Sequence, residues 1–235
     1  MSNSAISMYA LGLDQIATAI KLGGNKRTIL VQGHMGTGKS SLLKVLKAEM
    51  PNHTACYFDC TTKDLGDITI PQLATMSDDA TCVRYVPNEE LGIHLNKPII
   101  LMIDEYGKAN PAVKNALLRL MLERQIGSRK LRGIIFATTN LGSEGVGDLL
   151  PAHARNRLTV VKMRKPTNVE WIEEYAINNG IDHTMIAWVQ DNPQLFSTFE
   201  DIKDPQDNKF IFHPADPSRV SFVTPRSLEK ASNWL

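Results

Sequence analysis

The chain has 235 residues, of which 43% are hydrophobic and 22% charged, an ordinary composition for a globular protein. It is long enough to bury a core without a disulfide framework or a structural metal. Its 26 basic and 25 acidic residues give a formal charge of +1, which excludes a uniformly polybasic nucleic-acid coat and an acidic disordered tail.

The first half of the chain alternates short apolar runs with helical patterns. An amphipathic stretch near the N-terminus predicts a helix that Gly23 and Gly24 end. A β-branched run then predicts a buried parallel strand, and a glycine-rich segment follows it at once. The expected elements are a helix up to about Lys26, a strand at 28–31, a helix at 40–50 closed by Pro51, and a strand at 55–58.

Residues 61–97 contain many turn-forming residues, and we expect an irregular insert with short helical or hairpin pieces. The most apolar run of the chain, 99–103, predicts a strand buried on both faces. Asn110 and Pro111 form a helix start, and we expect Gly127 to end that helix. Further strands are expected at 134–137 and 158–161.

The pattern changes near Pro166. Thr167 and Glu170 form a capping box for a helix that ends at Gly180, and another helix is expected at 182–190. After a polar stretch with several prolines, Thr224 and Pro225 begin a last helix. We therefore expect an α/β core at 1–165, a parallel sheet sandwiched by helices, and a small helical domain at 166–235.

The cysteines and the hydropathy of the chain indicate a cytoplasmic protein. Cys56, Cys60 and Cys82 are too few for a disulfide scaffold, and no nearby cysteine or histidine pair completes a metal site. No apolar run approaches the ~20 residues of a membrane-spanning helix. The N-terminus has neither the basic nor the apolar segment of a signal peptide. We therefore expect no membrane partner.

The segment Gly33–Ser40 satisfies the phosphate-loop pattern G-x-x-x-x-G-K-[ST] between an expected strand and an expected helix. The glycines allow backbone N–H groups to point at phosphates, and the helix adds its positive end. Lys39 is expected to reach the β- and γ-phosphates of ATP, and Ser40 to offer its hydroxyl to Mg²⁺. The expected nucleotide-binding residues are Gly33, His34, Met35, Gly36, Thr37, Gly38, Lys39, Ser40 and Ser41.

Polar residues also follow two further expected strands, 99–103 and 134–137. Asp104 and Glu105 follow the apolar strand 99–103, so we expect Asp104 to bind Mg²⁺ and Glu105 to act as general base toward water. Asn140 follows the strand 134–137 and could orient that water or contact the γ-phosphate, with Thr138 and Thr139 as nearby alternatives.

Three arginines are candidates to neutralise charge on a phosphoryl group in transfer. Arg155 and Arg157 precede the last expected strand, and Arg226 lies at the start of the last helix. The competing interpretation of each is a surface ion pair.

In this order, the motifs resemble the AAA+ ATPases, and within them the MoxR-like branch and its phage and bacterial relatives. Residues 33–40 are similar to Walker A, 99–105 to Walker B, Asn140 to sensor 1, and Thr224-Pro-Arg226 to sensor 2. The MoxR-like likeness lies in Ile103-Asp-Glu-Tyr-Gly-Lys-Ala-Asn-Pro and in Leu117-Leu-Arg-Leu-Met-Leu-Glu-Arg-Gln-Ile126.

The resemblance implies a P-loop NTPase that binds ATP and Mg²⁺ and oligomerises, as a hexameric ring or spiral. Arg157 aligns with the arginine that such proteins insert into a neighbour's site, and Arg155 competes for that role. The resemblance also implies that the small helical domain is a lid over the nucleotide. Since only nine residues follow Arg226, we expect this lid to be short. The family implies remodelling of a protein client, often with a von Willebrand factor A-domain partner.

The resemblance also places two inserts, 61–97 and 125–133, at the pore of the ring. The second insert and the residue before it carry Arg124, Arg129, Lys130 and Arg132, which could contact a nucleic-acid backbone or form a merely solvated loop. The hypotheses are therefore a protein-remodelling ATPase, a nucleic-acid-associated ATPase in replication, repair or recombination, and a slow nucleotide-dependent scaffold. Glu105 counts against the scaffold, which needs no general base.

Overall fold

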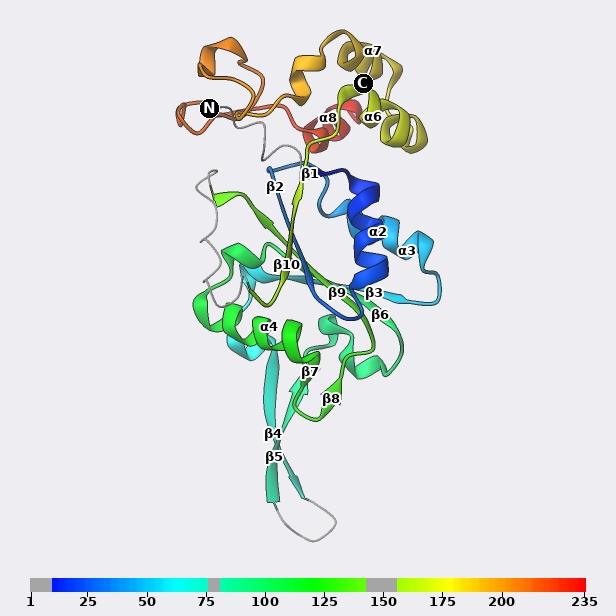
Figure 1. The fold of residues 1–235 in the computed structure, drawn as a ribbon, viewed down its shortest axis with the longest axis vertical. Helices are drawn as coiled ribbons and strands as arrows, with labels where there is room; N and C mark the ends of the chain where they lie inside the picture. Colours follow the sequence, from blue (N-terminus) through cyan, green and yellow to red (C-terminus); the bar gives the residue numbers. More distant parts are fainter. Residues whose placement is uncertain (1–9, 76–80, 143–155) are drawn as a thin grey trace.

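The computed structural model describes residues 10–75, 81–142 and 156–235. Within these ranges the centre of the molecule is a six-stranded parallel sheet with the strand order β1-β10-β2-β9-β6-β3 (Figure 1). The predicted parallel sheet is confirmed, and the short edge strand β1 was not predicted. The strands are β1 (Ala10–Leu11), β2 (Ile29–Gly33), β3 (Thr54–Asp59), β6 (Ile99–Asp104), β9 (Gly133–Asn140) and β10 (Thr159–Met163).

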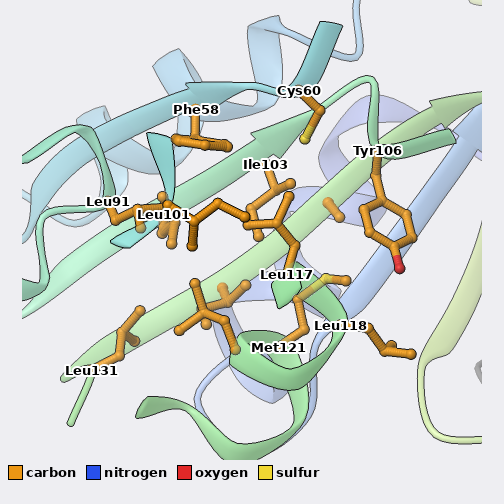
Figure 2. Packing of buried hydrophobic residues seen from close by; sticks show 14 of the residues in the cluster. Phe58, Cys60, Leu91, Leu101, Ile103, Tyr106, Leu117, Leu118, Met121 and Leu131 are labelled. Atoms are coloured by element: carbon orange, nitrogen blue, oxygen red, sulfur yellow. The ribbon is translucent and has the colours of Figure 1, made fainter. Parts of the chain in front are cut away.

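Helices cover both faces of the sheet, as expected (Figure 1). On one face, α2 (Leu13–Gly23) and α3 (Ser41–Glu49) pack their apolar residues against inward side chains of β2, β6 and β9. On the other face, α4 (Pro111–Glu123) places Leu117 and Met121 against Leu101 and Ile103 (Figure 2). The middle strands are therefore buried on both sides, which explains the long apolar runs in the sequence.

The helix α4 begins as predicted and ends earlier than predicted. The Asn110 side chain accepts a hydrogen bond from the backbone N–H of Val113 at 2.9 Å. The helix stops before Arg124, which has a left-handed backbone (φ 54°), and not at Gly127. The Arg124 guanidinium donates to the carbonyls of Gly24 and Gly133, and these tertiary contacts fix the helix end. Gly127 (φ 55°) instead forms the turn between β7 (Gln125–Ile126) and β8 (Arg129–Lys130).

The insert at 61–97 contains a long hairpin that extends from the end of the molecule opposite α6, α7 and α8 (Figure 1). Its strands β4 (Thr69–Thr75) and β5 (Thr81–Pro87) pair antiparallel along their whole length. Leu73, Val83 and Tyr85 are 80%, 53% and 54% exposed, so the hairpin presents apolar side chains to solvent. The rest of the insert consists of the 3₁₀ turns η1 (Cys60–Thr62), η2 (Leu65–Asp67), η3 (Glu89–Leu91) and η4 (Ile93–Leu95).

The residues after Met163 form a helical region with its own apolar cluster, which includes Trp171, Val189 and Leu228. The Thr167 capping box begins this region, and Gly180 ends its first helical segment with a left-handed backbone. Among the helices of the described ranges, none has both the length and the apolar character needed to cross a bilayer. The elements are α6 (Asn168–Glu170), the π-helical η7 (Trp171–Ala176), η8 (Ile177–Asn179), α7 (His183–Asp191), η9 (Pro193–Phe196), η10 (Pro205–Asp207) and α8 (Pro225–Ser232).

The fully buried Leu101 provides a test of the core (Figure 2). Leu101→Ala leaves a cavity between the sheet and α4, and we expect the free energy of unfolding to fall by about 2–5 kcal/mol in urea denaturation. Leu73→Ala is the control, because that side chain is 80% exposed, and its expected change is within about 0.5 kcal/mol. Equal effects of the two substitutions would contradict the packing of Leu101 between the sheet and α4.

Candidate nucleotide-binding site

The phosphate-loop motif lies where the sequence predicted it, between β2 and α3. Gly36 and Gly38 have positive φ angles of 70° and 92°, which the loop requires and which other residues rarely adopt. Gly36 also lies against the Thr224 side chain, since a Cβ atom added to Gly36 would be 2.6 Å from the Cβ of Thr224. The loop leads directly into the N-terminus of α3, an arrangement that favours a bound anion.

Lys39 is buried at the centre of the loop, with 7% of its surface exposed. Its Nζ donates to the Gly33 carbonyl at 2.9 Å, the His34 carbonyl at 2.8 Å and the Asn140 Oδ1 at 2.7 Å. These oxygens stabilise an ammonium group that would otherwise be costly to bury. A phosphate group bound in the loop would compete with these three oxygens for hydrogen bonds from the Lys39 ammonium group.

Asp104 has contacts at both of its carboxylate oxygens. Its Oδ1 accepts hydrogen bonds from the Thr138 hydroxyl and, at 3.1 Å, from the backbone N–H of Glu105. Its Oδ2 accepts from the Tyr57 hydroxyl at 2.9 Å and lies 3.5 Å from the Ser40 Oγ. The two predicted magnesium ligands, Ser40 and Asp104, are therefore adjacent.

Glu105 follows Asp104 with a left-handed backbone, φ 53°, which is unusual for a residue other than glycine and is typical of functional sites. The Asn140 Nδ2 lies 3.3 and 3.4 Å from the two carboxylate oxygens of Glu105. The Lys108 ammonium forms an ion pair with the same carboxylate at 3.1 Å. Asn140 thus links Lys39 of the phosphate loop to Glu105 through its two amide atoms.

The oxygen atoms at this edge of the sheet suit an Mg²⁺ ion that is bound partly by a nucleotide. They do not suit a metal ion that is bound by protein side chains alone. Within the described ranges, no group of three or more histidine, cysteine, aspartate or glutamate side chains could bind a metal ion. Mg²⁺ commonly binds one or two carboxylates together with phosphate oxygens and water. One carboxylate and one hydroxyl, from Asp104 and Ser40, beside a phosphate loop are the donors that such a site needs.

Tyr57 and Lys108 were not predicted from the sequence, and Thr138 was predicted only as an alternative to Asn140. Tyr57 lies on β3, beside the strand that ends in Asp104. Burial and the neighbouring Asp104 carboxylate raise the pKa of Tyr57, so its hydroxyl remains protonated and donates. The sequence did contain a signal for Tyr57, because side chains alternate between the two faces of a strand. Tyr57 and Asp59 therefore share one face of a strand that ends beside Asp104.

The remaining loop residues lie at the boundary with the helical region. The His34 ring is buried and packs edge-on against Phe199 at 5.1 Å, and Thr37 donates to the His34 carbonyl at 3.0 Å. Met35 is partly buried, and Ser41 begins α3. The loop therefore packs against the segment that precedes α8.

Of the candidate arginines, the two within the described residues, Arg157 and Arg226, make no hydrogen bond or ion pair with the phosphate loop. Arg226 is exposed at the start of α8, two residues after Thr224, which does contact the loop. Arg157 is exposed in the turn before β10, and Arg155 lies outside the described residues.

The expected basic loop is divided by the structure into two groups. The Arg124 side chain points inward to backbone carbonyls, so it is a structural residue and not part of a basic surface. Arg129, Lys130 and Arg132 are exposed on and beside the hairpin β7–β8.

Cys56, Cys60 and Cys82 are all free thiols, and Cys56 and Cys60 are buried.

No family model matches the chain. An "ATP-dependent protease ATP-binding subunit-like protein" of Rhodococcus erythropolis is 25% identical over 67% of this chain and 51% of its own length, so the chain spans about half of that relative. Among solved structures, NtrX of Brucella abortus in complex with ADP is 18% identical, with a TM-score of 0.44 over 75% of this chain and 44% of NtrX. A protein of Cytophaga hutchinsonii described as a candidate ATPase is 14% identical, with a TM-score of 0.47 over 97% of this chain and 59% of its own. The parallel sheet, its flanking helices and the loop between β2 and α3 give this chain a P-loop α/β fold.

The contacts of Lys39 provide a test of the phosphate loop. Lys39→Met removes the only ammonium group that the described contacts place inside the loop, and we expect ADP affinity to fall by about tenfold or more in calorimetric titration. Lys44→Met is the matched control, because Lys44 is exposed on α3 and should leave affinity unchanged. Equal affinities of the Lys39 variant and the wild type would exclude this loop as the phosphate site.

Proposed function

We propose that the chain is an AAA+ ATPase of the MoxR-like branch, which hydrolyses ATP in an oligomer to remodel a protein client. The observation that supports the ATPase most directly is the series of contacts from Lys39 through Asn140 to Glu105, next to the Asp104 and Ser40 pair. The similarity to the Rhodococcus protein supports the same family.

In this proposal Glu105 is the general base that takes a proton from the attacking water. Its carboxylate accepts from Asn140 and pairs with Lys108 through Oε2, and because each carboxylate oxygen has two lone pairs, Oε1 keeps one that can accept that proton. Lys39 and the N-terminus of α3 neutralise the phosphates. Mg²⁺, when bound by Ser40 and Asp104, would screen charge on the phosphate oxygens.

The oligomer belongs to the proposal because some of the candidate residues lie away from the loop. Arg157 is exposed, and in a ring it or Arg155 would enter a neighbouring site. Arg226 would respond to the nucleotide from the helical lid, since Thr224, at the same helix end, already touches Gly36. A ring or spiral assembled in this way would couple nucleotide binding to the subunit interface.

The protein client is supported by the exposed apolar hairpin β4–β5. A two-stranded hairpin is only marginally stable alone in water, and Leu73, Val83 and Tyr85 gain from contact with another apolar surface. The name of the Rhodococcus relative, an ATP-binding subunit-like protein of an ATP-dependent protease, agrees with a polypeptide substrate.

A nucleic-acid partner is the alternative, and the hairpin β7–β8 favours it. Arg129, Lys130 and Arg132 are exposed there, and Gly127 in its turn approaches the backbone of Tyr85 on β5. The basic side chains and an exposed aromatic ring therefore lie at the same end of the molecule, a combination that suits single-stranded nucleic acid.

The role of Glu105 is tested by Glu105→Gln. We expect kcat for phosphate release to fall by about 100-fold or more, because the amide is not a base, while ATP binding is retained. Glu123→Gln is the control, since Glu123 is exposed at the end of α4 and pairs with Arg119. A Glu105 variant that hydrolyses ATP at the wild-type rate would overturn the assignment of the base.

The two candidate partners are separated by measuring ATP hydrolysis with casein or with single-stranded DNA. If the client is a protein, casein stimulates the wild type, and Leu73→Ser with Val83→Ser loses more than about half of that stimulation at an unchanged basal rate. Leu22→Ser is the control, because Leu22 is 74% exposed on α2. Stimulation by DNA alone, lost on changing Arg129, Lys130 and Arg132 to alanine, would support the alternative.

A further inference from the structure

We infer that Tyr57 positions the Asp104 carboxylate for Mg²⁺ and thereby sets the magnesium dependence of nucleotide binding. The inference rests on the proposed function, because it takes Asp104 and Ser40 as the magnesium ligands. It adds a residue that lies outside the phosphate loop and outside the Asp104–Glu105 pair, on the neighbouring strand β3.

The contacts of Asp104 divide between its two oxygens. Thr138 and the Glu105 backbone N–H occupy Oδ1, on the side of β9. Oδ2 is the oxygen next to Ser40, and it is the one that the Tyr57 hydroxyl contacts at 2.9 Å. A carboxylate oxygen can accept a hydrogen bond and bind a cation with its second lone pair. Tyr57 therefore fixes the oxygen that faces the predicted metal without blocking it.

Tyr57 is the stronger of the two protein contacts at that oxygen. The Ser40 Oγ is 3.5 Å from Oδ2, at the limit of a hydrogen bond, whereas the Tyr57 hydroxyl is 2.9 Å from it. Without the Tyr57 hydroxyl, the carboxylate would be fixed firmly only through Oδ1. It could then rotate out of the plane that faces Ser40.

The ring and the hydroxyl of Tyr57 do different things, which makes the inference testable. Tyr57 is 46% exposed, whereas Asp104 is 7% exposed. β3 is one of the two edge strands of the sheet, so the ring lies at the solvent boundary of the site while its hydroxyl reaches the buried carboxylate. Tyr57→Phe keeps the ring and removes only the hydrogen bond. Because the side chain is half exposed, this change should not disturb folding.

The partners of metal ligands commonly tune metal affinity by 10- to 100-fold. For Tyr57→Phe we therefore expect the Mg²⁺ concentration that half-saturates the binding of a fluorescent ADP analogue to rise on the order of tenfold. ADP affinity in EDTA, where no metal contributes, should equal that of the wild type. Tyr85→Phe is the matched control, because its exposed ring lies on the distant hairpin β5 and should change neither value.

The outcomes distinguish this inference from the proposed function. If the wild type binds the ADP analogue with Mg²⁺ dependence and Tyr57→Phe has the same half-saturation, Tyr57 has no positioning role. An equal loss of affinity with Mg²⁺ and in EDTA would indicate a general structural effect and would also overturn the inference. If the wild type shows no nucleotide binding, the proposed function itself is wrong, and the role of Tyr57 is wrong with it.

Discussion

The parallel alignment of β2, β9 and β6 is the constraint on which the candidate site depends. Hydrogen-bonded register places Gly33 opposite Asn140 and Ile103 opposite Ala137, so the three carboxyl ends lie at one edge of the sheet. Residues about 35 to 100 positions apart in the sequence meet there, which explains why Lys39 reaches Asn140 and Asn140 reaches Glu105. A shift of one residue in either pairing would reverse the faces of the side chains and separate these groups.

The polar contacts at this edge have the character of a network rather than of isolated pairs. Lys39 and Lys108 contribute positive charge at opposite ends, and Asn140 and Glu105 connect them. In a partly buried setting each contact strengthens its neighbours, so changing one member alters the geometry of the others. Asp104 adjoins this network through the backbone N–H of Glu105 and is further fixed by the Thr138 and Tyr57 hydroxyls.

Most of the central sheet and the position of the phosphate loop in the candidate site were predictable from sequence because the signals are local. Apolar runs bounded by turns gave the strands, and the phosphate loop is a continuous motif. The early end of α4 was not predictable, because Arg124 ends it through contacts to Gly24 and Gly133, which are remote in sequence. Tyr57 was missed for a similar reason, since its role depends on the pairing of β3 with β6. The hairpin β4–β5 was only partly anticipated because its strands lack a buried face.

The contact between Gly36 and Thr224 ties together two positions that the phosphate-loop pattern treats as unrelated. The pattern leaves position 36 unspecified, yet the backbone there is left-handed and the space for a side chain is already filled by Thr224. Thr224 in turn caps α8 through its hydroxyl, and a serine that kept this cap would still place its Cβ and Oγ in the space beside Gly36. The residue types that position 36 can accommodate are therefore limited by the side chain that caps α8, which is remote from position 36 in the sequence.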